Sequence, residues 1–504
     1  MLQRKSGVLM HISSLPGPFG TGTIGTEARN FARKLVEMGC TYWQILPINH
    51  LSEINSPYSN LSLFALNPSF IDLYALVEEG VLSAEEVGDI ITVPGHKSHD
   101  LRILEKKKLI LLRRAFSRAD EKTICKVHEF SEKNKAWLDS YAVFVVLKNV
   151  YGNLVWNEWP GIGLRLHKTD AVLKAYEEYE NDVLFWKYIQ YVAYKQWFAF
   201  KKDVNEIGIK IIGDLPIYAS FDSADVWACN HLFCLNTKHI PKQVAGVPPD
   251  YFNRNGQLWG NPLYDWDEMK KDGYTWWMNR IQNALNLFDI VRIDHFRGIY
   301  SYWAVPFANK TAKKGEWLKG PGTDFVNVMK ERFKDGAMII EDLGYVDEDV
   351  AAFFNETGYP GMRVMQFGFG EEGNALHLTE HYIKNCVAYT GTHDNNSIIG
   401  WYEDVSDETA RDSINKLFPD AASVTDIKTL TNKEICHVWI DALFKSAADL
   451  AIVPIQDILY QDATSRMNTP GTQEGNWSYR LNAHQISELD IPWIRELNTK
   501  YNRI

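Results

Sequence analysis

Four acidic side chains each stand at the end of a short apolar run, a pattern that could support acid–base chemistry. Asp214 follows IIG, Asp294 follows VRI, Glu341 follows MII and Asp394 follows YTGTH. A single acid in such a place is commonly a helix cap or the start of a loop. Four acids brought together would repel one another, unless a task needs some of them charged and one neutral. The repeated pattern therefore predicts a catalytic centre made of carboxyl groups.

Arg292 lies two residues before Asp294 on the same apolar run. Alternate residues of a strand share one face, so we expect the guanidinium to point where the Asp294 carboxylate points. A fixed positive charge favours the ionised form of a carboxyl group and lowers its pKa. Asp294 is therefore predicted to be a charged nucleophile and not a proton donor.

Glu341 has a contrasting environment, because the AMII run before it is apolar. An apolar environment raises the pKa of a carboxyl group, which suits a proton donor. The neighbouring Asp342 leaves an ambiguity, since adjacent strand residues face opposite sides and only one of these acids can enter a shared site. The pattern alone does not say which one enters.

Two carboxyl groups with contrasting pKa values are the groups that cleave a glycosidic bond. One attacks the anomeric carbon, and the other protonates the leaving oxygen and then activates the acceptor. Asp394, flanked by His393 and Asn395, could bind hydroxyl groups of the sugar. A divalent-metal enzyme is the competing class, because it also gathers acids and histidines at strand ends. Arg292 argues against it, since a fixed cation would oppose a metal ion.

Eight apolar runs rich in Val and Ile must position these acids. Each has the length and composition of a parallel strand buried on both faces, and most gaps between them hold a helical stretch. The pattern predicts an α/β fold, a (β/α)₈ TIM barrel, whose strand ends direct side chains to a common centre. The runs are centred near Val8, Ile45, Ile211, Val291, Ile339, Val364, Ala388 and Val453.

Two gaps between the runs are too long for one crossover. Segment 75–205 is predicted to be an inserted, mainly helical subdomain, because its apolar residues recur at spacings of three and four. Segment 227–278 is rich in Pro, Gly and aromatic residues, and is predicted to be an irregular loop subdomain over the active face. We expect residues 1–504 to form a single catalytic barrel that carries both insertions.

Composition narrows the class of partner. The net charge of -11 argues against nucleic acid or an anionic membrane surface. No apolar run approaches the roughly 20 residues of a membrane span, and no secretory signal is recognisable, so a cytoplasmic protein is predicted. The spacing of Cys229, His231, Cys234 and His239 does not match the usual zinc pairs. The aromatic content of 13% fits either a large packed core or sugar-stacking surfaces.

Several motifs resemble a known family. RIDHFRG, IIEDLG and GTHDN occur in this order, together with SPYSNLSLFALNP, GVPPDYF, GQLWGNPLYDW and RMNTPGTQEGNW. They are similar to the 4-α-glucanotransferases called amylomaltases or disproportionating enzymes, glycoside hydrolase family 77 of the α-amylase clan. The similarity spans nearly the whole chain, and GVPPDYF and QLWGNPLYDW separate this family from ordinary amylases. It implies retaining transfer of an α-1,4-glucan segment to the 4-hydroxyl of glucose or another glucan, without a metal or cofactor.

The resemblance also implies residue roles. Asp294 would be the nucleophile and Glu341 the general acid/base, which would settle the choice against Asp342. Asp394 would bind the 2- and 3-hydroxyls of the donor sugar and stabilise the transition state. Tyr58 would stack beneath the donor ring, and Asp214 would contact the donor sugar. The full set of expected substrate-binding residues is Tyr58, Asp214, Asp250, Trp259, Arg292, His295, His393, Asn476 and Trp477.

Two other functions use the same features. A retaining α-glucan hydrolase would have the same acids, because hydrolysis and transfer differ in which acceptor reacts. Overhanging loops would favour a sugar acceptor by excluding water. A non-catalytic glucan-binding protein is a further class, against which the intact acid set argues. The expected partners are maltooligosaccharides and α-1,4-glucans, bound by a monomer or weak homo-oligomer.

Overall fold

The computed structural model describes residues 3–90, 101–249, 253–334, 336–370, 373–417, 429–472 and 474–504. Its centre is an eight-stranded sheet, and each strand falls within one of the eight apolar runs. The strands are β1 (Lys5–Leu9), β2 (Tyr42–Gln44), β3 (Lys210–Leu215), β6 (Ile290–Ile293), β9 (Met338–Ile340), β10 (Gly361–Val364), β11 (Cys386–Tyr389) and β12 (Leu450–Pro454).

All pairings in this sheet are parallel, and the strand order is β10-β11-β12-β1-β2-β3-β6-β9. The two end strands meet, because the Ile340 N–H at the end of β9 donates to the carbonyl of Pro360, just before β10, at 3.0 Å. The sheet thus curves into a barrel. The predicted (β/α)₈ fold is confirmed.

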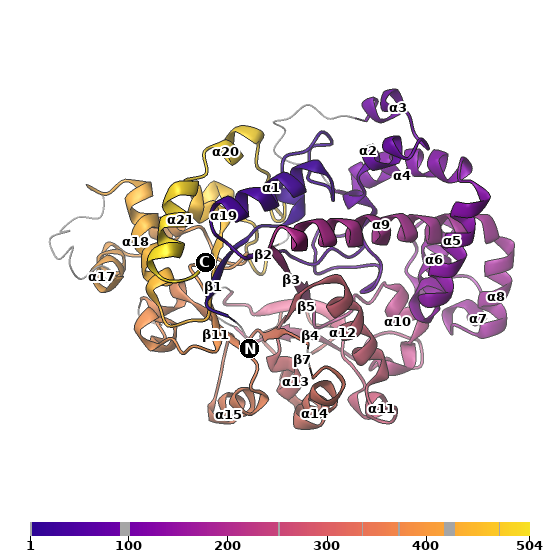
Figure 1. Ribbon diagram of the computed structural model, residues 1–504. Helices are drawn as coiled ribbons and strands as arrows, with labels where there is room; N and C mark the ends of the chain where they lie inside the picture. Colours follow the sequence, from indigo (N-terminus) through magenta and orange to yellow (C-terminus); the bar gives the residue numbers. More distant parts are fainter. Residues whose placement is uncertain are drawn as a thin grey trace.

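Helices surround the barrel and cover its outer face (Figure 1). These helices are amphipathic and bury one face, as α1 shows: its buried residues Ala28, Phe31, Ala32 and Leu35 share one side of the helix, at spacings of three and four. The longer covering helices are α1 (Thr26–Glu37), α12 (Thr275–Leu287), α14 (Gly322–Arg332), α15 (Glu348–Thr357), α17 (Asp407–Leu417), α18 (Asn432–Lys445) and α21 (Ile491–Lys500). Shorter helices are α10 (Ala224–Ala228), α11 (Trp266–Lys270), α13 (Arg297–Tyr300), α16 (Ile398–Asp404), α19 (Ile455–Ile458) and α20 (Ala483–Ser487).

The interior of the barrel has its own apolar cluster, which includes Ile212 and Ile290. Asp214 follows Ile212 by two residues, and Arg292 follows Ile290 by two. Alternation along a strand therefore places both charged groups on the inward face, directly above the apolar floor. The polar site and the barrel core are successive layers of the same strands.

The chain between β2 and β3 is mainly helical and forms a lobe on the right of Figure 1. Its helices are α2 (Leu73–Glu78), α3 (Ala84–Gly88), α4 (Leu101–Ser117), α5 (Glu121–Lys133), α6 (Lys135–Val150), α7 (Ile162–Arg165), α8 (Thr169–Glu178) and α9 (Glu180–Glu206). The long α9 also belongs to the barrel wall, because the Trp197 indole N–H donates to the carbonyl of Leu287 in α12 at 2.9 Å. On the same helix, Gln190 Oε1 accepts a hydrogen bond from the Leu66 N–H at 2.8 Å, and Gln190 Nε2 donates to the Leu66 carbonyl at 2.9 Å.

A second, antiparallel sheet was not predicted. Its order is β5-β4-β7-β8, formed by β4 (Gln243–Val247), β5 (Gln257–Pro262), β7 (Ser301–Pro306) and β8 (Glu316–Lys319). Segment 227–278 is therefore not irregular throughout. Its two strands are short and contain Gly246, Gly260 and Pro262, so they lack a clear alternating pattern. The two strands pair with each other, and β4 also pairs with β7 outside the segment, a long-range contact that leaves no local signal in the sequence.

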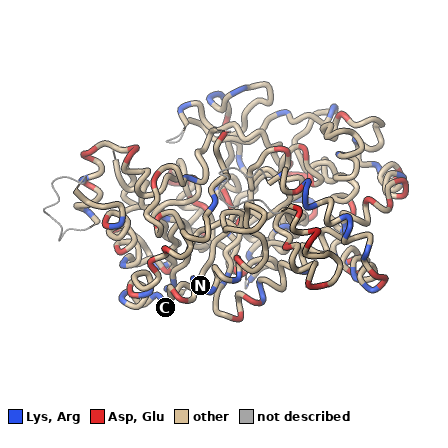
Figure 2. Tube along the Cα trace, turned by 90° about the horizontal axis from the view of Figure 1, so that it is seen from above, with Lys and Arg blue, Asp and Glu red and all other residues tan. Residues whose placement is uncertain are grey.

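Charge is distributed along the chain. Figure 2 shows acidic and basic residues interspersed over many elements, so the net charge of -11 is not gathered on one of them. Within the described ranges, no helix is long and apolar enough to cross a membrane.

Gly213 allows the close packing of β3 against the segment before β6. A Cβ at this position would overlap the ring of Phe288, which is buried. We expect Gly213→Ala to lower the free energy of unfolding by about 1–3 kcal/mol, because a buried ring must move. Thermal denaturation measures the effect. The control is Gly88→Ala in α3, which has open space for a Cβ and should be neutral or slightly stabilising. Equal melting temperatures for the two variants would contradict the prediction.

Candidate active site

The ends of the barrel strands bring together the acids that the sequence singled out. Asp214 lies on β3, Asp294 follows β6, Glu341 follows β9 and Asp394 lies in the loop after β11. Three of them surround a single guanidinium group, and the fourth contacts His393 beside them. The site is thus built where a barrel directs its side chains, at the carboxyl ends of the strands.

Arg292 is the centre of this cluster. Its Nη1 lies 2.8 and 2.7 Å from the two oxygens of Asp214, and its Nη2 lies 3.0 Å from Asp294 Oδ1 and 3.3 Å from Glu341 Oε2. Those last two oxygens can be no farther apart than the sum of their distances to Nη2. That limit admits the roughly 5–5.5 Å spacing of a retaining pair and lies below the roughly 6.5–9.5 Å of an inverting pair.

Asp214 has no exposed side-chain surface, with 0% accessible. It accepts two hydrogen bonds from Arg292 and one from the Tyr58 hydroxyl, at 2.8 Å. This placement differs from the expected direct contact with a donor sugar. The covered carboxylate instead fixes Arg292 and Tyr58, because it is the buried counter-charge of the guanidinium.

Glu341, and not Asp342, faces Arg292. Glu341 Oε2 also accepts a hydrogen bond from the backbone N–H of His295 at 2.6 Å, and His295 is in the left-handed region with φ 43°. Asp342 points elsewhere and accepts from Arg363 Nη1 at 2.9 Å and from the Met362 N–H at 2.6 Å. The ambiguity left by the sequence pattern is resolved by these contacts, in which Asp342 supports the start of β10.

Burial dominates the titration of both site acids. It raises the pKa of Asp294 well above its ordinary value and also raises the pKa of Glu341, while Arg292 opposes both shifts. The prediction that Arg292 would leave Asp294 with a lowered pKa is therefore wrong. Desolvation outweighs the guanidinium, and the charges of Glu341, Asp214 and Asp394 add repulsion. Such a pair favours the state in which it holds one proton between two carboxyl groups.

Aromatic groups form one wall of the site. The Tyr58 hydroxyl lies 2.9 Å from His393 Nε2, and the two rings are stacked with centroids 5.4 Å apart. The Trp477 ring lies 5.7 Å from Tyr58 and 5.9 Å from His393. Burial lowers the pKa of His393, so the wall is uncharged apart from the acids behind it. Flat, neutral rings with a polar edge are suited to a sugar face.

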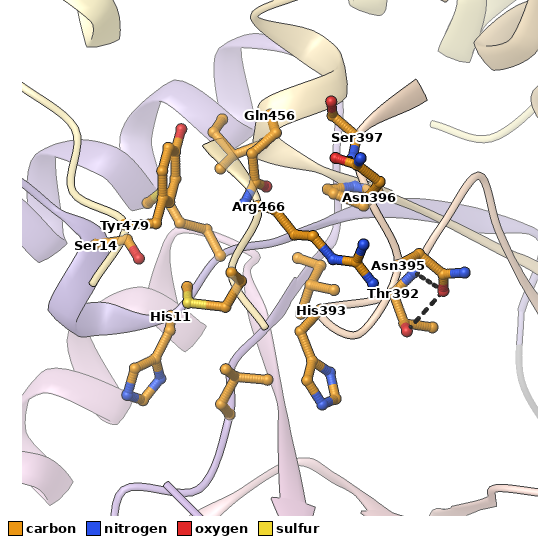
Figure 3. A pocket seen from close by; sticks show the side chains of 16 residues that line it. His11, Ser14, Thr392, His393, Asn395, Asn396, Ser397, Gln456, Arg466 and Tyr479 are labelled. Atoms are coloured by element: carbon orange, nitrogen blue, oxygen red, sulfur yellow. Dashed lines mark hydrogen bonds between the residues drawn. The ribbon is translucent and has the colours of Figure 1, made fainter. Parts of the chain in front are cut away.

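Asp394 is more open than the other acids, with 36% of its side chain exposed. Asn468 Nδ2 donates to its Oδ1 at 2.6 Å, and Arg466 Nη2 donates to its backbone carbonyl at 2.8 Å. Figure 3 shows Arg466 extending toward Thr392 and Asn395 in a neighbouring pocket. Neither Arg466 nor Asn468 is among the predicted site residues, although both lie in the motif RMNTPGTQEGNW.

The remaining expected residues lie around the cluster. Trp259 on β5 is 36% exposed, and its ring meets the His295 ring edge-on at 4.9 Å. Burial lowers the pKa of His295 to about 3, so this imidazole is neutral. The Asn476 amide is engaged inside its own loop, with Thr469 N–H at 2.9 Å and the Thr472 carbonyl at 3.0 Å. It therefore shapes the loop that carries Trp477. Asp250 lies outside the described residues.

Metal ligation has no candidate group in the described part of the chain, where no three His, Cys, Asp or Glu side chains gather suitably. The acids of the barrel mouth are instead held by Arg292. The sulfur and imidazole groups near residue 230 include Cys229, whose thiol pKa is raised to about 12 by burial. A thiol in that environment stays protonated and is a poor metal ligand.

The chain is similar in sequence and in fold to known proteins. The sequence profile of the 4-α-glucanotransferases, glycoside hydrolase family 77, matches residues 10–486. The chain belongs to glycoside hydrolase family 77. A 4-α-glucanotransferase from Streptococcus pneumoniae is 39% identical over 505 residues, covering 100% of this chain and 98% of that protein. One from Thermus thermophilus is 39% identical, covering 96% of each chain.

Solved structures of the family have the same fold. An amylomaltase from Streptococcus agalactiae, in complex with acarbose, superposes with a TM-score of 0.93 at 36% identity and covers 99% of this chain and 100% of that one. An amylomaltase from Corynebacterium glutamicum shares the fold at 18% identity, with a TM-score of 0.78 over 99% of this chain and 74% of that one. The fold is thus shared between chains that are only 18% identical.

The Asp214–Arg292 pair should be a strong determinant of stability. We expect Arg292→Gln to cost about 3–5 kcal/mol in the free energy of unfolding, because Asp214 stays buried without its counter-charge. The double variant Arg292→Gln/Asp214→Asn removes both charges and should recover part of that loss, with a coupling energy of roughly 0.5–3 kcal/mol. Urea denaturation at neutral pH measures both. A double variant no more stable than Arg292→Gln would refute this account.

Proposed function

We propose that this protein is a 4-α-glucanotransferase that moves an α-1,4-glucan segment from one maltooligosaccharide or glucan to the 4-hydroxyl of another. The observation that carries the proposal is the convergence of Asp294 and Glu341 on one guanidinium nitrogen, which keeps their contacting oxygens closer together than the spacing of an inverting pair. Membership of family 77 supports the choice of glucan as substrate.

In the first step Asp294 attacks the anomeric carbon of the donor. The bond from that carbon to the glycosidic oxygen breaks, and its electron pair goes to the oxygen, which takes a proton from Glu341. Glu341 Oε2 accepts from both His295 N–H and Arg292 Nη2, so the transferable proton belongs on Oε1. The raised pKa of Glu341 suits a group that must hold this proton near neutral pH.

In the second step the acceptor 4-hydroxyl attacks the glycosyl ester. Glu341, now ionised, takes the hydroxyl proton, the bond between the anomeric carbon and Asp294 breaks, and the Asp294 carboxylate is released. Two inversions at one carbon leave the product with the α configuration of the donor. Arg292 lies beside Asp294 throughout and stabilises its anionic form, against the burial that opposes it.

Neighbouring groups position the sugar ring in this scheme. The Tyr58, His393 and Trp477 rings offer a face for stacking, and the open carboxylate of Asp394 is available to the ring hydroxyls. Asp394 is held by Asn468 and therefore needs little reorganisation as positive charge develops at the anomeric centre. Trp259, on the sheet beside the barrel, offers a further exposed ring.

A product profile from maltotriose tests the proposed reaction against its runner-up, an α-glucan hydrolase. Transfer gives glucose together with a ladder of longer maltooligosaccharides, while the number of reducing ends stays nearly constant. Chromatography of the products over time, with a parallel reducing-end assay, distinguishes the two. A steady rise in reducing ends without longer products would rule out transfer. The same experiment in excess EDTA should give the same ladder.

The two acids should respond differently to an activated donor. Glu341→Gln should lower turnover of maltotriose by roughly 10²–10⁴-fold, because the leaving oxygen is no longer protonated. With α-maltosyl fluoride the leaving fluoride needs no strong acid, so this variant should recover fluoride release. Asp294→Asn lacks the nucleophile and should be inactive on both donors. Fluoride release measured in both variants is the readout, and equal rescue of both would contradict the assigned roles.

A further inference from the structure

A hollow of about 270 Å³ opens between the helical lobe and the barrel, away from the acids described above. Its walls come from α6, α10 and α12, which lie along one side of the molecule in Figure 1. It has no lining residue in common with the cluster around Arg292. Its size is close to the lower end of small-molecule sites, which span roughly 300–1,000 Å³.

Three aromatic rings line one part of this hollow. Phe64 is stacked with Trp137 at 6.0 Å and 12°, and meets Trp276 edge-on at 6.5 Å and 80°. Phe64 is buried, whereas both indoles are half-buried. The Trp137 N–H donates to Asn134 Oδ1 at 3.3 Å, which fixes the orientation of this ring. The two indoles come from different elements, and the part of each ring that stays exposed offers apolar surface of the kind on which a pyranose stacks.

A stripe of amide side chains on α12 completes the wall. Trp276, Asn279, Asn283 and Asn286 recur at spacings of three and four, so they share one face of the helix. A surface helix usually carries charged residues on such a face. Arg332 donates to Asn279 Oδ1 at 3.2 Å and Tyr194 donates to Asn283 Oδ1 at 3.3 Å. The amide nitrogens of Asn279 and Asn283 have no protein acceptor in the part of the chain that the structure describes.

The hollow carries little charge. Of its lining residues, only Lys133 and Asp225 have acidic or basic side chains. Lys133 is exposed, and Asp225 is buried and accepts the Leu63 N–H at 2.9 Å. Oriented amides beside aromatic rings, with exposed Lys133 as the one lining side chain that carries an exposed charge, match a neutral polyhydroxylated ligand better than an ionic one.

We propose that this hollow is a second glucan-binding site, which holds a non-reacting stretch of an α-1,4-glucan on the outside of the barrel. The inference rests on the proposed function, because that function makes glucans the substrates. A long polymer anchored there would stay near the catalytic mouth, and its free ends would reach the acids at a raised effective concentration. A short donor such as maltotriose is too short to gain from this tether.

Retardation of the protein in native gels that contain amylose tests the site. The measurements use an Asp294→Asn background, so that the glucan is not consumed. We expect Trp276→Ala, and separately Asn279→Ala/Asn283→Ala, to weaken the apparent affinity for amylose at least threefold. Trp276 also packs against Phe233 and Tyr264, at 6.0 and 5.7 Å, so the double amide variant, which keeps this ring, is decisive. Asn30→Ala, an exposed amide on α1, is the matched control and should leave retardation unchanged.

Kinetics with the catalytic acids intact separate this inference from the proposed function. The double amide variant should raise KM for amylose at least threefold and leave kcat/KM for maltotriose unchanged. Unchanged retardation and unchanged KM for amylose would overturn the second site, even if maltotriose is disproportionated normally. Loss of transfer from maltotriose in the unmodified protein would overturn the proposed function instead. A concentration-dependent dimer that Trp276→Ala disrupts, with unchanged amylose affinity, would assign the hollow to a second copy and also overturn the inference.

Discussion

The organisation of the site depends on one guanidinium group that serves three carboxylates. Arg292 is nearly buried, with 4% of its side chain exposed, and it contacts Asp214, Asp294 and Glu341 at once. Nη1 alone contacts both oxygens of Asp214, which leaves Nη2 for the two reacting acids. A lysine could not hold this geometry, because its ammonium is a point charge without a planar fork. The barrel thus supports a charge arrangement that would be unstable without this residue.

The strands determine how that arrangement is reached. Ile212 and Ile290 belong to the apolar floor, and the next inward positions on the same strands are Asp214 and Arg292. The register pairs Asp214 directly with Arg292, so the buried ion pair is also a cross-strand pair. Above it, the left-handed residue His295 turns its backbone N–H toward Glu341. One short segment, from Arg292 to His295, therefore supplies a cation, the proposed nucleophile and a donor to the proposed acid.

Much of this could be predicted from the sequence because it depends on local pattern. Continuous apolar runs predict buried parallel strands, and acids at their ends predict a common mouth. Quantities that depend on the balance of the whole environment could not be predicted. The pKa of Asp294 is raised by burial, which the residues next to it in the sequence do not indicate. Asp214 is covered in part by Tyr58, which lies 156 positions away in the sequence. The second sheet was missed because the strands of its first hairpin are short and interrupted by Gly246, Gly260 and Pro262, and Asn468 was missed because an amide carries no distinctive spacing.

The long helix α9 belongs both to the barrel and to the helical lobe, and this constrains how the protein could change in evolution. It packs on the barrel as a helix of the connection between β2 and β3, and it is also the longest helix of the lobe. Gln190 of α9 is hydrogen-bonded to the backbone of Leu66, eight residues beyond Tyr58, and Trp197 of α9 donates a hydrogen bond to α12. The lobe therefore cannot be removed without also removing a helix that packs on the barrel. A lineage that trimmed it would have to rebuild a barrel helix and the support of a substrate-facing loop in the same event.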